Sequence, residues 1–176
     1  MTKIEDIKRI LVVENSEQHI EAARKQLGQY ELAIVSDYRA FLEKVIGTRV
    51  QKYIMGYPDS IELAIGFPKN PNYDAVLTDM NFPEKPGSHE NALGYAVAMM
   101  CAAAKVPLVG IVSATNHHMG PLAEGLAKLK HLDSKGLFQV GDTRIMYFDD
   151  DDLDTRNQPK RWDKALEYLL VGRNEG

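Results

Sequence analysis

Three polar residues each follow directly on a short apolar run, as residues do at the ends of buried strands. They are Glu14, Asp79 and Ser113. In an open parallel sheet, ligands bind outside the carboxyl ends of the strands. If the three runs form neighbouring strands, two carboxylates and one hydroxyl converge at the same edge of the sheet.

Converging carboxylates repel each other, and such a pair persists when a cation lies between them. Oxygen-only ligands suit Mg²⁺ or a similar hard ion. A carboxylate beside Mg²⁺ can also attack a phosphoryl group and become an acyl phosphate. The alternative is that each residue merely ends a strand and faces water. Because all three stand at corresponding ends, we favour a site.

The elements that must position these residues follow a regular alternation. Short apolar runs alternate with helical patterns, which predicts an α/β fold with a largely parallel sheet. The five predicted strands are Ile10–Val13, Leu32–Val35, Ala75–Thr78, Pro107–Val112 and Ile145–Phe148. The five predicted helices begin near Asn15, Asp37, Ser88, Gly120 and Pro159.

One segment, Arg49–Asn72, does not fit the alternation. We interpret it as an insertion before the third strand, with an extra strand or a short hairpin, because a structureless loop of this length is uncommon in a compact domain. The sequence has no internal repeat and no low-complexity linker. A chain of 176 residues is therefore expected to form one domain over residues 1–176.

Composition excludes several classes of protein. The net charge of −4 argues against a nucleic-acid binder, which usually carries a basic patch. The single cysteine, Cys101, forms no disulfide framework and is typical of a core residue in a reducing cytosol. No apolar run reaches the roughly 20 residues of a membrane span, and the charged N-terminus is not a signal peptide. We expect a cytoplasmic protein with no membrane or nucleic-acid partner.

Common nucleotide and hydrolase motifs are missing. The chain has no G-x-G-x-x-G after a strand, no G-x-x-x-x-G-K-[ST] and no G-x-S-x-G. Dinucleotide binding through a Rossmann turn, a P-loop and a nucleophile elbow are therefore not supported.

Three stretches resemble the receiver domain of two-component response regulators, in particular a stand-alone, chemotaxis-regulator-like receiver. ILVVEN is similar to the first strand of that family, AVLTDMNFP to the strand and loop that carry the phospho-accepting aspartate, and PLVGIVSAT to the fourth strand. The resemblance implies a flavodoxin-like fold: a five-stranded parallel sheet in the order 2-1-3-4-5, flanked by helices.

The resemblance also implies residue roles. Asp79 would be the phospho-acceptor and Ser113 the switch hydroxyl. Glu14, Asp79 and the backbone carbonyl of Asn81 would be ligands of Mg²⁺. Asn15 stands where the family has a second acid, and an amide oxygen is a weaker ligand for Mg²⁺ than a carboxylate.

The end of the fifth strand departs from the family pattern. The family has a lysine there that bonds the phosphoryl group, but no lysine occurs from Ile145 to Pro159. We therefore expect a charge-assisted hydrogen bond of roughly 1.5–3 kcal/mol to be unavailable. The run Asp149–Asp152 stands there instead, either as a solvated loop that caps the last helix or as the source of the missing metal ligand. Tyr147 is the candidate switch aromatic.

Two classes of function follow. In the first, the chain is a stand-alone signalling module and not an enzyme: Asp79 accepts a phosphoryl group, with Mg²⁺, from a histidine kinase or phosphotransfer protein. Output then passes to a downstream protein by direct contact, since only Arg173–Gly176 follow the last helix. In the second, it is a degenerate pseudo-receiver that binds partners independently of phosphorylation. A Mg²⁺-dependent hydrolase on a similar sheet is a third alternative.

Overall fold

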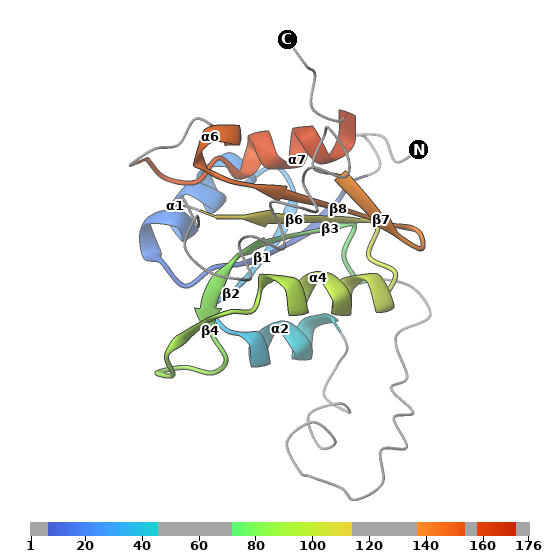
Figure 1. Cartoon of the computed structure of the whole chain (residues 1–176). Helices are drawn as coiled ribbons and strands as arrows, with labels where there is room; N and C mark the ends of the chain where they lie inside the picture. The colour runs from blue at the N-terminus through green and yellow to red at the C-terminus, as the bar shows by residue number, and fades with distance from the viewer. Residues whose placement is uncertain (1–6, 46–71, 114–136, 154–157, 172–176) are drawn as a thin grey trace, which may run out of the picture.

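The computed structural model describes residues 7–45, 72–113, 137–153 and 158–171 (Figure 1). A six-stranded sheet in the order β2-β1-β3-β6-β8-β7 forms the centre. Its strands are β1 (Arg9–Val13), β2 (Glu31–Val35), β3 (Ala75–Asp79), β6 (Leu108–Val112), β7 (Leu137–Val140) and β8 (Thr143–Phe148). A separate antiparallel pair consists of β4 (Asn81–Pro83) and β5 (Glu90–Ala92).

The sheet confirms a mainly parallel α/β fold, but its order differs from the predicted 2-1-3-4-5. The five predicted strands pair in parallel as β2-β1-β3-β6-β8, and a sixth strand, β7, adds to β8 in antiparallel direction. A turn at Gly141, with φ +59°, joins β7 to β8. This hairpin was not predicted, because we interpreted only the run after the turn as a strand.

Helices cover both faces of the sheet, which explains why β1, β3 and β6 are apolar on both sides. The described helices are α1 (Glu17–Gln26), α2 (Tyr38–Val45), α4 (Gly94–Ala103), α6 (Asp150–Leu153) and α7 (Trp162–Val171). In Figure 1, α1 and α7 lie on one face and α2 and α4 on the other. Leu11 and Val13 accordingly belong to the core under α2 and α4, whereas Ile10 and Val12 belong to the core under α1 and α7.

Two predicted helix starts have different outcomes. Asp37 caps α2 as predicted, since its Oδ1 accepts a hydrogen bond of 2.9 Å from the backbone N–H of Ala40. Ser88 does not cap α4; it closes a turn with Lys85, and the β4–β5 pair separates it from the helix. The helix predicted to begin near Gly120 lies outside the described residues, as does the proposed insertion apart from Asn72.

α4 starts in close contact with the end of β3. The N–H of Gly94 donates to the carbonyl of Met80 at 3.0 Å. A Cβ at position 94 would lie 2.7 Å from the carbonyl oxygen of Asp79, so only glycine fits here without a shift of the backbone. The first turn of α4 is therefore fixed against the residue that sequence analysis selected as the phospho-acceptor.

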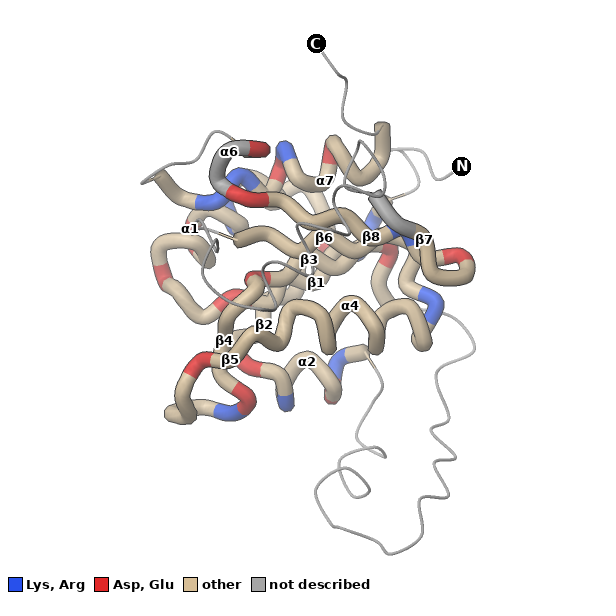
Figure 2. The backbone as a smooth tube through the Cα atoms, viewed as in Figure 1, with Lys and Arg blue, Asp and Glu red and all other residues tan. Residues whose placement is uncertain are grey.

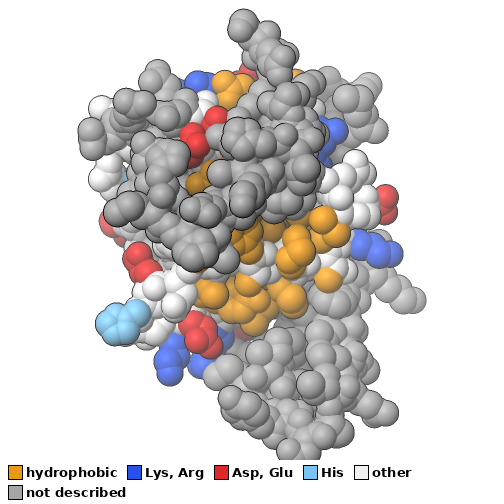
Figure 3. Space-filling view, viewed as in Figure 1, with side chains coloured by type: hydrophobic (Ala, Val, Ile, Leu, Met, Phe, Trp, Pro, Cys, Tyr) orange, Lys and Arg blue, Asp and Glu red, His pale blue; other side chains and the backbone are white. Residues whose placement is uncertain are grey.

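Among the helices that the structure describes, α4 differs from the others in having no charged residue (Figure 2). Val97, Ala98 and Cys101 are buried against the sheet, as predicted for the cysteine. On the outer side, Met99 is 47% exposed, and Figure 3 shows hydrophobic side chains gathered on the face that carries α4. Among the described residues, no helix combines the length and the apolar composition that a bilayer span requires.

Candidate functional site

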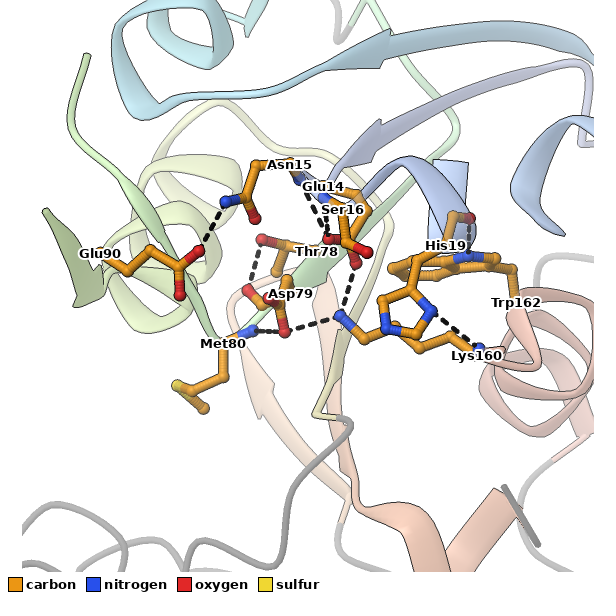
Figure 4. Close-up of polar contacts among 10 residues, drawn as sticks. All are labelled: Glu14, Asn15, Ser16, His19, Thr78, Asp79, Met80, Glu90, Lys160 and Trp162. Atoms are coloured by element: carbon orange, nitrogen blue, oxygen red, sulfur yellow. Dashed lines mark hydrogen bonds and ion pairs between the residues drawn. The ribbon is translucent and has the colours of Figure 1, made fainter. Parts of the chain in front are cut away.

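The candidate site lies at the carboxyl ends of β1 and β3 (Figure 4). Val13 and Thr78 are register partners on these neighbouring strands, so the next residues, Glu14 and Asp79, emerge side by side. Glu14 is fully buried, and 16% of the Asp79 side chain is exposed. The predicted convergence of these two carboxylates is what the structure shows.

A lysine side chain lies between the two carboxylates. The Nζ of Lys160 is 2.5 Å from Oε2 of Glu14 and 2.7 Å from Oδ1 of Asp79. The expectation that no lysine is available for Asp79 was therefore wrong. The receiver family has its lysine before a proline, whereas in this chain Lys160 comes directly after Pro159. Along the chain, the short helix α6 lies between β8 and Lys160, and Lys160 comes just ahead of α7.

Helix α1 holds the backbone of Lys160 in place. Nδ1 of His19 accepts a hydrogen bond from the Lys160 N–H at 3.3 Å, and Nε2 of Gln26 donates to the Lys160 carbonyl at 3.0 Å. The Trp162 indole donates to the His19 carbonyl at 3.0 Å, and the Asp163 N–H donates to Oε1 of Gln26 at 3.3 Å. His19 and Gln26 are seven residues apart, about two helical turns, so they lie on the same side of α1.

The charges of the site do not cancel. Two carboxylates share one ammonium, which also lies 5.3 Å from the centre of the Trp162 ring. Burial raises the pKa of the Asp79 carboxyl above its ordinary value of 3.8; Lys160 opposes this shift and the neighbouring Glu14 adds to it. Asp79 therefore holds a proton more readily than an exposed aspartate does.

The second oxygen of Glu14 is also engaged. Its Oε1 accepts hydrogen bonds from the backbone N–H groups of Asn15, at 3.0 Å, and Ser16, at 2.9 Å. The amide nitrogen of Asn15 donates to Oε1 of Glu90 at 2.6 Å. Glu90, from β5, is an acidic neighbour that sequence reasoning missed, because nothing local in the sequence shows that the β4–β5 pair folds back toward β1.

The residues present do not fit the magnesium site that the resemblance implies. Both oxygens of Glu14 already accept hydrogen bonds from the chain, and the Asn15 amide is turned toward Glu90. In the part of the chain that the structure describes, no group of three or more Asp, Glu, His or Cys side chains is placed to hold a metal ion. The residue types matched the ligand chemistry of Mg²⁺, but the tertiary structure puts a lysine between them.

Asp79 retains one carboxylate oxygen for chemistry. Its Oδ1 accepts hydrogen bonds from Lys160 and from the Met80 N–H, the latter at 2.7 Å. Among the contacts between described residues, Oδ2 accepts none. A partly exposed carboxylate with one oxygen held and the other open is suited to act as a nucleophile.

The other predicted residues lie nearby but in different settings. Ser113 is buried directly after β6, one residue beyond Val112, which is the register partner of Asp79. Its N–H donates to the Phe148 carbonyl at 2.9 Å. Asn81 is half-buried in β4, and Tyr147 is half-buried on the α4 face of the sheet.

The acidic run after β8 forms a helix rather than a solvated loop. Asp149 and Asp152 each accept a hydrogen bond from the other's backbone N–H, at 3.0 and 3.1 Å, which closes the first turn of α6. These carboxylates therefore stabilise the start of α6, and they do not cap α7 as the simpler of the two predictions proposed.

Comparisons with known proteins add no function. No protein-family model and no curated protein matches the chain. One solved structure, described as amino acids 181–211 of the yeast Spc42 trimeric coiled coil fused to another structure, is 15% identical with a TM-score of 0.44. The alignment covers 97% of this chain and 77% of that one, and a similarity at this level carries no argument about function.

Proposed function

We propose that the chain is a receiver-like signalling module in which Asp79 accepts a phosphoryl group from a histidine kinase or phosphotransfer protein. The observation that carries the proposal is the buried ammonium of Lys160, 2.7 Å from Asp79. It supplies the positive charge for a phosphoryl group that we expected to be missing, because no lysine occurs from Ile145 to Pro159. The parallel strands in the order β2-β1-β3-β6-β8 are compatible with the flavodoxin-like receiver fold that the proposal includes.

The proposed step is a displacement at phosphorus. Oδ2 of Asp79 attacks the phosphorus of a donor phosphohistidine, and a new oxygen–phosphorus bond forms. The phosphorus–nitrogen bond breaks, its electron pair stays on the imidazole, and Asp79 becomes an acyl phosphate. The Lys160 ammonium donates a hydrogen bond to a phosphoryl oxygen and so stabilises the charge that develops there.

The output of the module follows from Ser113 in this proposal. The Ser113 hydroxyl, at the end of the strand beside β3, bonds the phosphoryl group, and the resulting shift changes the surface offered to a downstream protein. Its position one residue beyond the register partner of Asp79 supports this role.

Chemical phosphorylation tests the proposal. The chain is incubated with phosphoramidate and its intact mass is measured, with Asp79→Asn as the test variant and Asp163→Asn as a control at a partly exposed aspartate. We expect the wild type and Asp163→Asn to gain one hydroxylamine-sensitive phosphoryl group and Asp79→Asn to gain none. Equal labelling of Asp79→Asn, or no labelling of the wild type, would refute the assignment.

A degenerate pseudo-receiver is the second candidate, and one observation favours it. The chain's own donors engage both oxygens of Glu14 and one oxygen of Asp79. In that case Lys160 stabilises the fold, and the chain binds a partner protein in the same way with or without phosphorylation. An unlabelled wild type with a native circular-dichroism spectrum would favour this candidate.

A further inference from the structure

We infer that the ammonium of Lys160, and not a divalent metal ion, is the resident cation between Glu14 and Asp79. The inference deepens the proposed function by naming the positive charge that serves the phosphoryl site. Only this role of Lys160 toward a phosphoryl group rests on the proposed function. Which cation lies between the two carboxylates is a property of the folded chain, and it can be measured without phosphorylation.

The hydrogen-bond partners of the two carboxylates carry the first step. Oε2 of Glu14 accepts a hydrogen bond from the Lys160 ammonium, and Oε1 accepts hydrogen bonds from two backbone N–H groups. Oδ1 of Asp79 pairs with the Lys160 ammonium and accepts a hydrogen bond from the Met80 N–H. A magnesium ion needs several oxygen lone pairs directed at it in a near-octahedral arrangement. Those of Glu14 are directed at the chain's own donors instead.

Charge carries the second step. A metal ion that entered between the carboxylates would come within a few ångströms of the Lys160 ammonium, and like charges in a partly buried site repel strongly. Binding would therefore require Lys160 to leave. The side chain is 2% exposed, so leaving means moving an ammonium out of a buried position beside the Trp162 ring.

The anchoring of the Lys160 backbone carries the third step. Its N–H is bonded to His19 and its carbonyl to Gln26, both on α1, and the adjacent Trp162 is bonded to His19 as well. The residue is thus attached at both backbone polar groups. With its backbone held in this way, Lys160 can withdraw its ammonium from the carboxylates only by a rotamer change of a side chain that is 2% exposed.

Metal titration of the full chain tests the inference. Free Mn²⁺ is measured by electron paramagnetic resonance during titration of the wild type, Lys160→Met and Lys164→Met. Lys164 is the matched control, because it is a lysine of α7 beside an aromatic ring, 5.6 Å from the centre of Tyr168. We expect Lys160→Met to bind Mn²⁺ at least about tenfold more tightly than the other two, a difference that Glu14→Gln in the same chain removes.

Tight Mn²⁺ binding by the wild type, lost in Asp79→Asn or Glu14→Gln, would overturn the inference. Should Lys160→Met fail to fold, the wild type alone decides. The ¹⁵N signal of the Lys160 ammonium is expected to be protected from exchange and to keep its chemical shift in millimolar Mg²⁺. Loss of that protection on adding Mg²⁺ would show that a metal displaces the lysine.

The phosphoramidate reaction separates this inference from the proposed function. Labelling of the wild type at rates within about threefold with EDTA and with Mg²⁺ supports both. Labelling with Mg²⁺ only overturns the inference and leaves Asp79 as the phospho-acceptor. Labelling under neither condition refutes the proposed function, and the Mn²⁺ titration then still decides which cation the site holds.

Discussion

At the scale of single residues, the site holds more negative charges than positive ones. Glu14 and Asp79 present two buried or nearly buried carboxylates to the one ammonium of Lys160. Glu14 is further stabilised by two backbone N–H groups, whereas Asp79 has one. Asp79 is therefore the member whose charge is the less well compensated, and burial raises the pKa of its carboxyl.

The raised pKa of Asp79 predicts a pH dependence of stability. In the unfolded chain an aspartate titrates near 3.9, so between this value and the raised pKa the folded state binds more protons. The contribution of Asp79 to the free energy of unfolding is therefore full below the unfolded pKa and is lost as the pH rises through the folded pKa. The Asp79→Asn variant has no carboxyl to titrate at this position and does not lose this contribution. Its free energy of unfolding relative to that of the wild type should therefore increase as the pH rises from about 4. Urea unfolding at several pH values measures the difference.

Asp163 provides the control with the opposite sign. Burial opposes ionisation of Asp163, but hydrogen bonds from Arg161 and from the backbone outweigh it and hold the pKa of Asp163 below 3.8. Its contribution is present above the unfolded pKa and is lost as the pH falls through the folded pKa. Asp163→Asn should thus approach the wild type in stability on acidification. Parallel curves for both variants would contradict the two shifts.

At the scale of secondary-structure elements, the site depends on two contacts between neighbours. The α1–α7 contact fixes the backbone of Lys160 through His19 and Gln26. The contact of α4 with the end of β3 fixes the backbone at Asp79, since the Gly94 N–H donates to the Met80 carbonyl. The nucleophile and the cation are thus positioned from opposite faces of the sheet.

Gly94→Ala tests the second of these contacts. The added Cβ would lie 2.7 Å from the Asp79 carbonyl oxygen and 3.0 Å from the Met80 Cα, and both are backbone atoms that cannot rotate away. We expect a loss of about 1–3 kcal/mol in the free energy of unfolding from overpacking. Chemical denaturation measures the loss, and amide NMR should show shifts at Asp79 and Met80.

Ala103→Ser is the matched control for that substitution. It also adds one small group to α4, but at an exposed position near the end of the helix. A surface substitution of this kind changes stability by no more than about 0.5 kcal/mol. If Gly94→Ala were equally harmless, α4 would not be fixed against the end of β3 as described.

At the scale of the whole molecule, one sheet joins two cores. Alternate residues of each central strand enter the core under α1 and α7 or the core under α2 and α4. Gly110, on β6, shows how closely α7 approaches, since a Cβ there would lie 2.8 Å from a Leu77 methyl group and 3.1 Å from one of Leu169. The two cores share the strands of one sheet, so unfolding of one core should expose the other core to water.

Unfolding of the two cores should therefore coincide. Trp162, the single tryptophan, is buried in the core under α1 and α7, and its fluorescence in urea should give the same midpoint as far-ultraviolet circular dichroism. Leu169→Ala, in one core, should cost about 2–5 kcal/mol, and Val97→Ala, in the other, should also destabilise the chain. Each should lower both midpoints together. Separate midpoints would show that the cores unfold independently.

The sequence by itself determined five strands of the main sheet and where their polar ends lie, but it did not determine β4, β5 or β7. Short runs that are apolar on both faces and alternate with helical patterns indicate strands covered on both sides, and the residue after each run then reaches the same edge of a parallel sheet. Glu14, Asp79 and Ser113 could be located on that basis, as could the helix start at Asp37. These features depend on local pattern, which a linear sequence carries in full.

Only the tertiary structure decided what lies between the carboxylates. Lys160 is 146 residues from Glu14 along the chain, and hydrogen bonds with His19 and Gln26 of α1 hold its backbone. The Asn15–Glu90 contact and the edge strand β7 likewise arise from chain reversals whose direction no local pattern specifies. A buried charge takes its partner from whichever segment the packing brings near, so the chemistry of this site was set by long-range contacts.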